Sequence, residues 1–469
     1  MLWACVLLPR LALDDVLRRR PPSDEPLVLV GGPANARIVV AANRFAQAAG
    51  IYRGQRLSAA QALLNHFDTV EYDPAATARA HRFLAAWAYG YSSDVALLPH
   101  AVVLEVSKSR NLFGPWCDFE TTLREGLVEQ GFHHRVALAP NAHAAHVLAG
   151  VRDGLAVTTT DELRRTLAPI PVQRARLPGG VADALASMGV RTLGQLMQLP
   201  RAGVQRRFGA GLIDHLDELT GDAPAQLESF RPPDSLDLRM EWSHEVEHSG
   251  ALVFPLRRLT GDLAAYLAGR DGGVQRFVVE LEHRTGEPTR MPIGLLAAER
   301  DARLLFDCAR ERLERQALPS SVVAMRLVAS ELPPFVPAGR DLFDTRPANA
   351  MPLDQLRGRL LARLGEKAIY RLGRTVDPRP EHAQAREPTA VVPVPEPSPR
   401  PTWLLDKPVP LYGETLTILA GPERLETGWW DSGDMRRDYY VARTAQGQRA
   451  WVYRAPDAPG RWMLHGWFA

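Results

Sequence analysis

The sequence lacks the cysteine pattern that a disulfide framework or a zinc site requires. Its three cysteines, Cys5, Cys117 and Cys308, lie far apart and form no C-x-x-C pair. It also lacks a long hydrophobic run, because the apolar residues 3–8 are too few to cross a membrane and Pro9 follows at once. We therefore expect a cytoplasmic protein without a signal peptide or a membrane span.

An excess of charge of one sign is missing too. The 56 basic residues are nearly balanced by 54 acidic ones, which leaves a net charge of +2. If nucleic acid is a partner, basic residues must therefore cluster locally. A chain of 469 residues with 46% hydrophobic and 23% charged residues is globular over most of its length.

The first third of the chain alternates strand-like and helix-like segments. Strands are expected at residues 2–8, 100–107 and 135–139, and longer helices at 75–89 and 119–130. This order predicts an α+β ferredoxin-like sheet with helices on one face. Two short helices are expected between the early strands, and Ser58 with Gln61 resembles a capping box that opens the second one.

A glycine-rich turn follows near residue 180. Leu177-Pro-Gly-Gly180 precedes an amphipathic helix, and Thr192 is expected to cap the next helix. The backbone amides at Gly179 and Gly180 could hold a DNA phosphate, or the glycines could serve an ordinary helix–helix turn. His143 and His146 share one helix face upstream, but they lack a nearby third ligand, so we expect no metal site.

Residues 237–332 repeat an α+β pattern of the βαββαβ type. Arginines at its strand positions could follow a phosphate backbone, or they could form the solvated face of a half-buried sheet. These candidate DNA-binding residues are Arg257, Arg258, Arg276, Arg284 and Arg290.

The C-terminal part differs in composition from the rest. Residues 376–402 hold eight prolines and are expected to form a linker. Beyond them, residues 403–469 contain six of the ten tryptophans between short strand-like runs, which predicts a small β-rich module. Its tryptophans could stack single-stranded bases, but a role as core or as a protein-binding surface is favoured.

Arg37-Ile-Val-Val-Ala-Ala-Asn43, followed by Gly50 and Gly54, resembles the fingers signature of Y-family translesion DNA polymerases. Leu138-Ala-Pro140 and Met188-Gly-Val190 continue the resemblance, which covers roughly residues 1–345. It implies a right-hand fold with a ferredoxin-like palm, small helical fingers, a helix-hairpin-helix thumb and a βαββαβ little finger. The expected boundaries are 1–37 and 66–165 for the palm, 38–65 for the fingers, 166–230 for the thumb, 236–335 for the little finger, 336–375 for a clamp-motif segment and helix, 376–402 for the linker and 403–469 for the β-rich interaction module.

The residues that such polymerases need for catalysis do not occur at the matching positions. Three carboxylates would hold two Mg²⁺ ions, but the chain has Leu7, His100 and Ala101 there. The family's triphosphate contacts match Arg44, Gln47 and His146. We therefore expect no catalytic site, no metal and no cofactor, and we keep as the alternative an active lesion-bypass polymerase whose metal ligands are rearranged around Glu105 or Asp14.

This pattern is similar to a narrower group of Y-family-like proteins, the ImuB group, which lacks the catalytic carboxylates. Leu8-Pro9-Arg10 near the start, and Gly428-Trp-Trp430 with Leu464-His-Gly-Trp-Phe468 near the end, resemble that group. The resemblance implies an inactive adaptor in SOS-induced mutagenic translesion synthesis, cytoplasmic and nucleoid-associated. It would bind primer-template DNA, the replicative sliding clamp, an ImuA-type RecA-like protein and an error-prone C-family DNA polymerase. A protein scaffold that has also lost DNA binding is a third possibility.

Gly339-Arg-Asp-Leu-Phe343 resembles a bacterial clamp-binding pentapeptide, with Asp341, Leu342 and Phe343 as the candidate clamp contacts. An exposed Leu-Phe pair would enter a hydrophobic pocket of the clamp. Alternatively, Leu342 and Phe343 pack the last helix onto the little finger.

Overall fold

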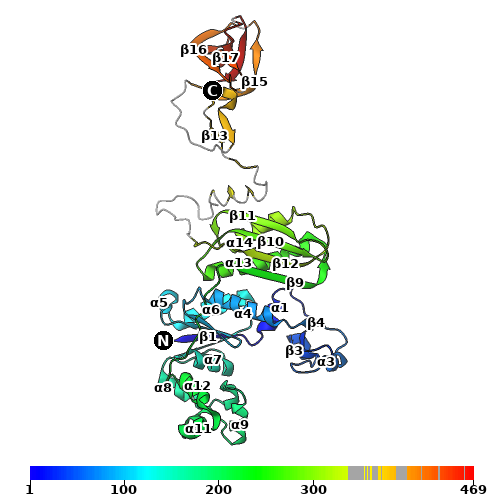
Figure 1. Cartoon of the computed structure of the whole chain (residues 1–469), viewed down its shortest axis with the longest axis vertical. Helices are drawn as coiled ribbons and strands as arrows, with labels where there is room; N and C mark the ends of the chain where they lie inside the picture. The colour runs from blue at the N-terminus through cyan, green and yellow to red at the C-terminus, as the bar shows by residue number, and fades with distance from the viewer. Residues whose placement is uncertain are drawn as a thin grey trace. The chain divides into compact units, whose positions relative to one another are not determined.

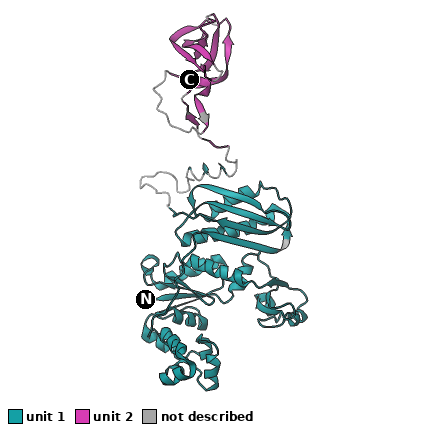
Figure 2. Cartoon of the chain, viewed as in Figure 1, with its two compact units in different colours: residues 1–363 teal, residues 364–469 magenta. Residues whose placement is uncertain are grey.

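The structure is a computed structural model of the whole chain. It describes residues 1–335, isolated positions between 353 and 370, and then residues 372–375, 377–386, 399–413, 415–430, 434–458 and 460–469. The chain forms two compact units, Met1–Arg363 and Leu364–Ala469, which Figure 2 colours separately. Within the described ranges, every helix is too short or too polar to cross a bilayer.

The palm is a five-stranded sheet in the order β5-β6-β1-β7-β8. Its strands are β1 (Trp3–Leu7), β5 (Val95–Leu98), β6 (Ala101–Glu105), β7 (Arg135–Ala139) and β8 (Leu155–Ala156). The buried central strand β1 runs antiparallel to both β6 and β7, as the apolar run at the start of the sequence predicts.

Helices cover both faces of the palm sheet, so the expectation of helices on one face is wrong. Helices α4 (Pro74–Ala88) and α6 (Trp116–Gln130) share one apolar cluster with Val6, Val102 and Leu104 of the sheet. Helix α7 (Ala142–Val151) shares a second cluster with the alternate residues, including Cys5, Val103 and Ala137. The small alanine side chains of α7 and of the facing strands allow this close packing.

The fingers contain a separate three-stranded sheet in the order β3-β2-β4. Its elements are β2 (Leu27–Gly31), β3 (Ile38–Ala42), α2 (Arg44–Ala48), α3 (Leu57–Leu63) and β4 (Asp68–Glu71), and helix α1 (Leu11–Leu17) precedes them. Asn43 caps α2, because its side chain accepts a hydrogen bond from the backbone N–H of Ala46. The expected capping box at Ser58 is wrong: α3 begins at Leu57, and its N-cap is Arg56, two residues before Ser58, which makes no side-chain cap.

The thumb is a set of short helices. They are α8 (Thr160–Leu167), α9 (Val181–Ser187), α10 (Leu193–Met197), α11 (Arg201–Phe208) and α12 (Ala210–Thr220), with a short α5 (Arg110–Phe113) earlier in the palm. Thr192 forms the expected cap, as part of a capping box with Gln195. Several thumb residues, such as Leu185 and Leu212, join α7 in the second palm cluster.

The little finger has the predicted βαββαβ order (Figure 1). Its elements are β9 (Leu236–Val246), α13 (Val253–Gly269), β10 (Val274–His283), β11 (Thr289–Glu299), α14 (Ala302–Leu313) and β12 (Val322–Ala329). The strands form one antiparallel sheet in the order β11-β10-β12-β9. Inward residues such as Phe277, Val279 and Leu281 are fully buried, while the residues between them point to the other face.

The C-terminal unit is β-rich, as its composition predicts. A short hairpin of β13 (Leu372–Arg374) and β14 (Gln384–Arg386) precedes an antiparallel sheet in the order β15-β19-β18-β17-β16. The strands are β15 (Trp403–Leu411), β16 (Thr417–Thr427), β17 (Met435–Arg443), β18 (Arg449–Arg454) and β19 (Trp462–Trp467). Trp451 is buried and stacks on Tyr439 with ring centroids 4.0 Å apart. The expected α+β multidomain fold class with an added β-rich C-terminal region is thereby confirmed.

Candidate functional site

Leu7 and Ala101 lie directly opposite each other on the neighbouring strands β1 and β6. Both are buried, with exposed fractions of 6% and 0%, and both belong to the apolar cluster beneath α7. The fold therefore brings two of the three positions expected for metal ligands together. The side chains there are hydrocarbon and offer no oxygen to a cation.

His100, at the third position, is exposed and adopts a left-handed backbone conformation with φ of 56°. Its carbonyl oxygen accepts a hydrogen bond from the backbone N–H of Leu8 at 2.8 Å. On the next residue, the carbonyl of Ala101 accepts one from Nε2 of His81 at 2.8 Å. The loop that carries His100 is thus held by structural hydrogen bonds on either side.

His146, which matches the family's triphosphate-binding lysine, is buried in α7. Its Nε2 donates a hydrogen bond to the carbonyl oxygen of Pro99 at 3.1 Å. Burial, with the nearby positive charge of Arg176, lowers the pKa of His146 to about 3. The imidazole is therefore neutral and ties α7 to the loop before β6.

Two other matched positions lie at the start of α2. Arg44 is 77% exposed at its side chain and stands 3.5 Å from a carboxylate oxygen of Asp24. The side chain of Gln47 turns back toward the preceding strand, since its Nε2 donates to the carbonyl of Ala42, the last residue of β3, at 2.8 Å. The positions Arg44, Gln47 and His146 are therefore engaged locally or exposed.

The carboxylates that could replace the missing ligands are occupied elsewhere. Glu105 pairs in register with Trp3, at the opposite end of β1 and β6 from Leu7, and accepts backbone hydrogen bonds from Leu2 and Ser107 at 3.3 and 3.0 Å. Asp14 is buried and accepts from the backbone N–H of His133 at 2.9 Å. Partial burial opposes ionisation of Glu105, but its hydrogen bonds hold its pKa below the usual value.

A pocket of about 390 Å³ borders His100. Its lining contains no carboxylate and consists of Leu11, Pro74, Thr77, Ala78, His81 and residues 97–100. In the part of the chain that the structure describes, no group of three or more His, Cys, Asp or Glu side chains is placed to hold a metal ion. His143, for which a metal role is not expected, contacts Glu218 through Nδ1 at 3.0 Å.

A larger groove, of about 970 Å³, lies between α1, the start of α2 and the little finger. Its walls include Arg10, Phe45, Trp242 and Phe254. None of Leu7, His100 and Ala101 lines it. The largest of these openings therefore lies away from the expected metal positions.

The glycines of the thumb turn are exposed. Gly180 is the N-cap residue of α9 and has φ of +76°, a conformation that favours glycine. A Cβ added at Gly179 or Gly180 would meet no atom within 4 Å. The turn therefore presents its backbone to the outside, as either of its two interpretations requires.

Two of the five candidate DNA-binding arginines lie on α13 and differ in their surroundings. Arg257 is exposed, with its guanidinium 4.6 Å from the centre of the Phe306 ring. Arg258 points into the palm instead: it donates to the carbonyl of Gln130 at 2.5 Å and lies 3.3 Å from Asp262. Burial lowers the pKa of Arg258 to about 10.

The other three candidates lie on or beside strands and are exposed. Arg284 pairs with Glu245. Arg290 lies 3.0 Å from Glu280. Arg276 lies on the same outward row of β10 as Glu280 and makes no ion pair with the residues that the structure describes. Most of these arginines thus already have an acidic partner.

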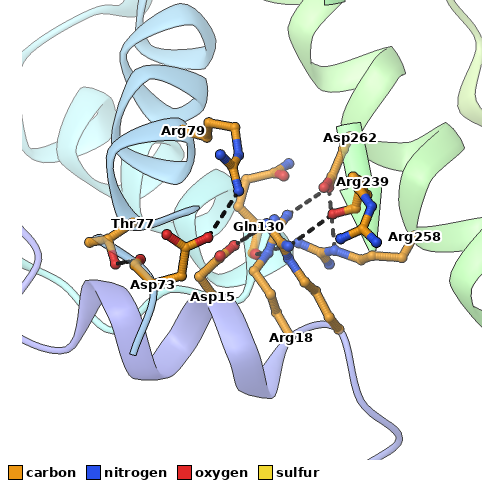
Figure 3. A network of polar contacts seen from close by, with 10 residues as sticks. Asp15, Arg18, Asp73, Thr77, Arg79, Gln130, Arg239, Arg258 and Asp262 are labelled. Carbon is orange, nitrogen blue, oxygen red and sulfur yellow. Dashed lines mark hydrogen bonds and ion pairs between the residues drawn. The ribbon is translucent and has the colours of Figure 1, made fainter. Parts of the chain in front are cut away.

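An unexpected polar network joins the palm to the little finger (Figure 3). Nη2 of Arg18, just after α1, lies 2.6 Å from Oδ1 of Asp262 on α13, and Nε of Arg18 donates to the carbonyl of Gln130 at 2.8 Å. Asp15 stands 3.9 Å from Arg18. Burial raises the pKa of Asp15, although Arg19 and Arg18 oppose the shift.

One feature of the sequence could have revealed this network. Asp262 interrupts the apolar face of α13, with Leu259 three residues before it and Tyr266 four residues after it. All three are buried. A carboxylate on the apolar face of a helix implies a buried partner.

In the C-terminal unit, the two tryptophans of the segment after β16 are exposed. The side chains of Trp429 and Trp430 are 78% and 56% exposed and contact each other edge to face. The candidate clamp residues Asp341, Leu342 and Phe343 lie outside the described residues, as do residues 376 and 387–398 of the expected linker, whereas residues 384–386 of that linker form strand β14.

Comparison with known proteins gives three kinds of match. The family model described as "IMS: impB/mucB/samB family" matches residues 14–150. Protein ImuB of Caulobacter vibrioides is 28% identical over 468 residues, covering 89% of this chain and all of the relative. DNA polymerase IV of Pseudomonas entomophila is 25% identical over 258 residues, covering 52% of this chain and 71% of the relative.

Among solved structures, an insertion ternary complex of Dbh DNA polymerase matches with a TM-score of 0.43 at 15% identity, covering 71% of this chain and all of that one. DinB from Sulfolobus solfataricus matches with a TM-score of 0.40 at 14% identity, covering 70% of this chain and 98% of that one. The similarity to ImuB thus extends into the C-terminal part of the chain, whereas the match to DNA polymerase IV covers about half of it.

Proposed function

Because the chain is an ImuB-like, Y-family polymerase-like protein, we propose that it is a catalytically inactive adaptor in DNA damage tolerance. It binds primer-template DNA and brings a separate polymerase to it. In this role the polymerase-like fold serves as a docking body, and the phosphoryl-transfer chemistry is carried out by the partner.

The observation that carries this proposal is the buried contact of Leu7 with Ala101. Two-metal phosphoryl transfer needs carboxylate oxygens that hold the metals beside the attacking and leaving oxygens. Two of the three matching positions instead form part of an apolar cluster. The third, His100, carries a nitrogen ligand, which suits softer cations than Mg²⁺.

The alternative of an active polymerase with rearranged ligands needs Glu105 or Asp14 at the metal site. Glu105 lies at the far end of the strand pair, at a distance of about 13 Å from Ala101 by strand geometry. Asp14 is held by His133. Both carboxylates would have to leave hydrogen bonds that satisfy them where they are.

Primer extension by the purified full chain separates these two functions. With Mg²⁺ or Mn²⁺, a primed template and all four nucleotides, we expect no incorporation above a protein-free control. Incorporation that is lost in Glu105→Gln or Asp14→Asn would overturn the adaptor proposal and support the alternative. Incorporation that survives both substitutions would point to a contaminating polymerase.

DNA binding is proposed for the exposed thumb turn at Gly179 and Gly180 and for the exposed arginines of the little finger, chiefly Arg257, Arg276, Arg284 and Arg290. Arg258 is left out, because its guanidinium is engaged with the palm. A gel-shift on primer-template DNA tests this. Loss of binding in Arg257→Gln with Arg276→Gln is expected, and no binding by the wild type would favour the pure protein scaffold.

Partner binding is proposed for two regions. The C-terminal unit, with exposed Trp429 and Trp430, would bind the C-family polymerase or the ImuA-type RecA-like protein. A pull-down from damaged cells, with the full chain and with a chain ending at Thr402, tests this: the truncated chain should lose the polymerase.

The segment with Asp341, Leu342 and Phe343 would bind the sliding clamp. Leu342→Ala with Phe343→Ala should abolish clamp binding and leave DNA affinity unchanged. A clamp affinity equal to that of the wild type would exclude this segment as the clamp site.

A further inference from the structure

The outward face of the little-finger sheet carries a continuous row of charged side chains. In register across the strands, Arg290 of β11 faces Glu280 of β10, Glu280 faces Arg326 of β12, and Arg326 faces Arg239 of β9. Two arginines side by side would repel each other unless carboxylates lay between them. Glu282, one further outward position along β10, supplies such a carboxylate.

These charges are joined into close ion pairs. Arg326 binds Asp237 through two nitrogens at 2.6 and 2.8 Å, and its third nitrogen lies 3.4 Å from Glu280. Glu280 also lies 3.0 Å from Arg290. One carboxylate thus bridges two arginines, and its side chain is only 11% exposed.

The second half of the network is centred on Arg239. Its guanidinium binds both oxygens of Glu282, at 2.8 to 3.1 Å, and contacts Glu241 at 2.6 Å. The hydrogen bond from Arg239 holds the pKa of Glu282 below its usual value, so this carboxylate is ionised at neutral pH. Two bidentate pairs, Arg326–Asp237 and Arg239–Glu282, therefore flank the bridging Glu280.

The face as a whole has no excess of positive charge. Its four arginines at positions 239, 276, 290 and 326 are matched by four acids at positions 237, 241, 280 and 282. Binding to a phosphate backbone draws its free energy from the release of condensed counterions when cations approach. Arginines that are already paired with a carboxylate contribute little to this counterion release, and the carboxylates repel the phosphates.

We propose that Glu280 and Glu282 are built-in counterions that restrain the affinity of the little-finger sheet for DNA, so that this face binds a phosphate backbone only by exchanging carboxylate for phosphate at Arg239, Arg290 and Arg326. This inference rests on the proposed DNA-binding function and adds its regulation. It assigns the acidic residues of the face a role in setting affinity, and it adds Arg239 and Arg326 to the DNA-facing residues.

The exchange is uneven across the face. Glu280 is held between two arginines and is nearly buried, so phosphate displaces it less readily than Glu282, and it repels phosphate for as long as it remains in place. Glu282 is 28% exposed and can turn toward solvent, which leaves Glu241 as the carboxylate that contacts Arg239. Neutralising Glu280 should therefore raise affinity more than neutralising Glu282.

The test is a fluorescence-anisotropy titration of primer-template DNA with the full chain, the single variants Glu280→Gln and Glu282→Gln, and the double variant. Glutamine keeps the size and some hydrogen bonds but removes the charge. We expect the double variant to bind roughly 5- to 50-fold more tightly at about 0.1 M salt, with a salt slope steeper by roughly 1 to 2. Glu280→Gln should account for the larger share.

A matched control removes two acidic charges elsewhere in the same unit, with Glu228→Gln and Glu314→Gln, both exposed. Equal tightening by this pair would show that net charge alone acts, and it would overturn the inference. Unchanged affinity of the double variant beside a binding wild type would overturn it too, while leaving the DNA-binding proposal standing. If neither protein binds DNA at low salt, both proposals fall.

Thermal unfolding of each variant checks the fold. If Glu280→Gln unfolds early, Glu282→Gln alone decides the outcome through Arg239, because its carboxylate is the more exposed of the two. A Glu282→Gln protein that melts like the wild type but binds DNA no more tightly would then overturn the inference.

Discussion

Arg18 and Asp262, which are 244 positions apart in the chain, form a buried ion pair between the palm and the little finger. Nη2 of Arg18 lies 2.6 Å from Oδ1 of Asp262. Their side chains are 3% and 8% exposed. Arg258 approaches the same carboxylate from the side, and backbone carbonyls of the palm accept from both guanidiniums. The first helix of the palm and the long helix of the little finger are thereby held in one fixed contact.

Asp262→Ala should strongly destabilise the N-terminal unit. The substitution leaves Arg18 and Arg258 buried without their carboxylate, and breaking one side of a buried pair costs about 3–5 kcal/mol. Urea unfolding followed by circular dichroism measures the change. As a control, Asp234→Ala removes the 98% exposed partner of Arg270 and should cost less than about 1 kcal/mol. Equal effects of the two substitutions would mean that the buried ion pair stabilises the fold no more than the exposed one.

Restoring a carboxylate at Leu7 should damage the palm. Leu7→Asp places a charge in the apolar cluster opposite Ala101, and we expect a loss of about 4 kcal/mol or more in the free energy of unfolding. His100→Asp is the control, because this position is exposed and its left-handed backbone suits aspartate. A stable Leu7→Asp protein would contradict the assignment of this position to the core.

His146 should make the protein less stable in acid. Its pKa is lowered from 6.5 to about 3 in the fold, so the unfolded chain binds the proton first. The stabilisation is complete above pH 6.5 and is lost as the pH falls from there toward 3, by about 2 kcal/mol between pH 7 and pH 5. Denaturant unfolding of the wild type and His146→Gln at both pH values measures this.

In His146→Gln the side-chain amide can still donate to the carbonyl of Pro99, but no proton is taken up. We expect a smaller loss of stability on going to pH 5 than in the wild type. Some loss should remain, because burial also lowers the pKa of His81, His134 and His215. If the free energy of unfolding depends on pH in the same way in both proteins, His146 is ruled out as a source of the acid sensitivity.

The tryptophans of the C-terminal unit should separate into two classes. Trp429→Ala with Trp430→Ala should abolish capture of the partner polymerase and leave the melting temperature unchanged, because both rings are exposed. Trp451→Ala should unfold the unit, because its ring is buried against Tyr439, with an expected cost of about 3–5 kcal/mol. Loss of single-stranded DNA binding with partner capture retained would instead favour base stacking by the exposed pair.

The elements that the sequence predicted correctly are those set by local patterns. Thr192 indicated a helix start, and alternating apolar residues indicated the βαββαβ order of the little finger. The prediction at Ser58 was wrong, because the carbonyl of Arg56 accepts the hydrogen bonds of the Ala59 and Ala60 backbone N–H groups, which places Ser58 inside the first turn of α3. The second face of the palm sheet was missed, because an alanine-rich helix such as α7 shows no strong apolar stripe.

The candidate site was only partly accessible from sequence. The positions of Leu7 and Ala101 could be named by resemblance, but their direct contact depends on strand register. The role of Arg258 could not be foreseen, because the sequence pattern around an arginine on a helix is the same whether its side chain faces DNA or a buried aspartate. The carboxylates facing Arg239 and Arg326 come from strands far apart in sequence, so only the folded sheet reveals that the charges cancel.

The contact between Leu7 and Ala101 has an evolutionary consequence. A reversion to a metal-binding palm would need acidic residues at both facing positions, and the first to appear would be a lone charge in a dry apolar cluster. The intermediate would lose stability before the second substitution could supply any catalytic benefit. Under the adaptor proposal, hydrocarbon side chains at this place would make a loss of catalysis hard to reverse, and selection would then act on what the protein binds.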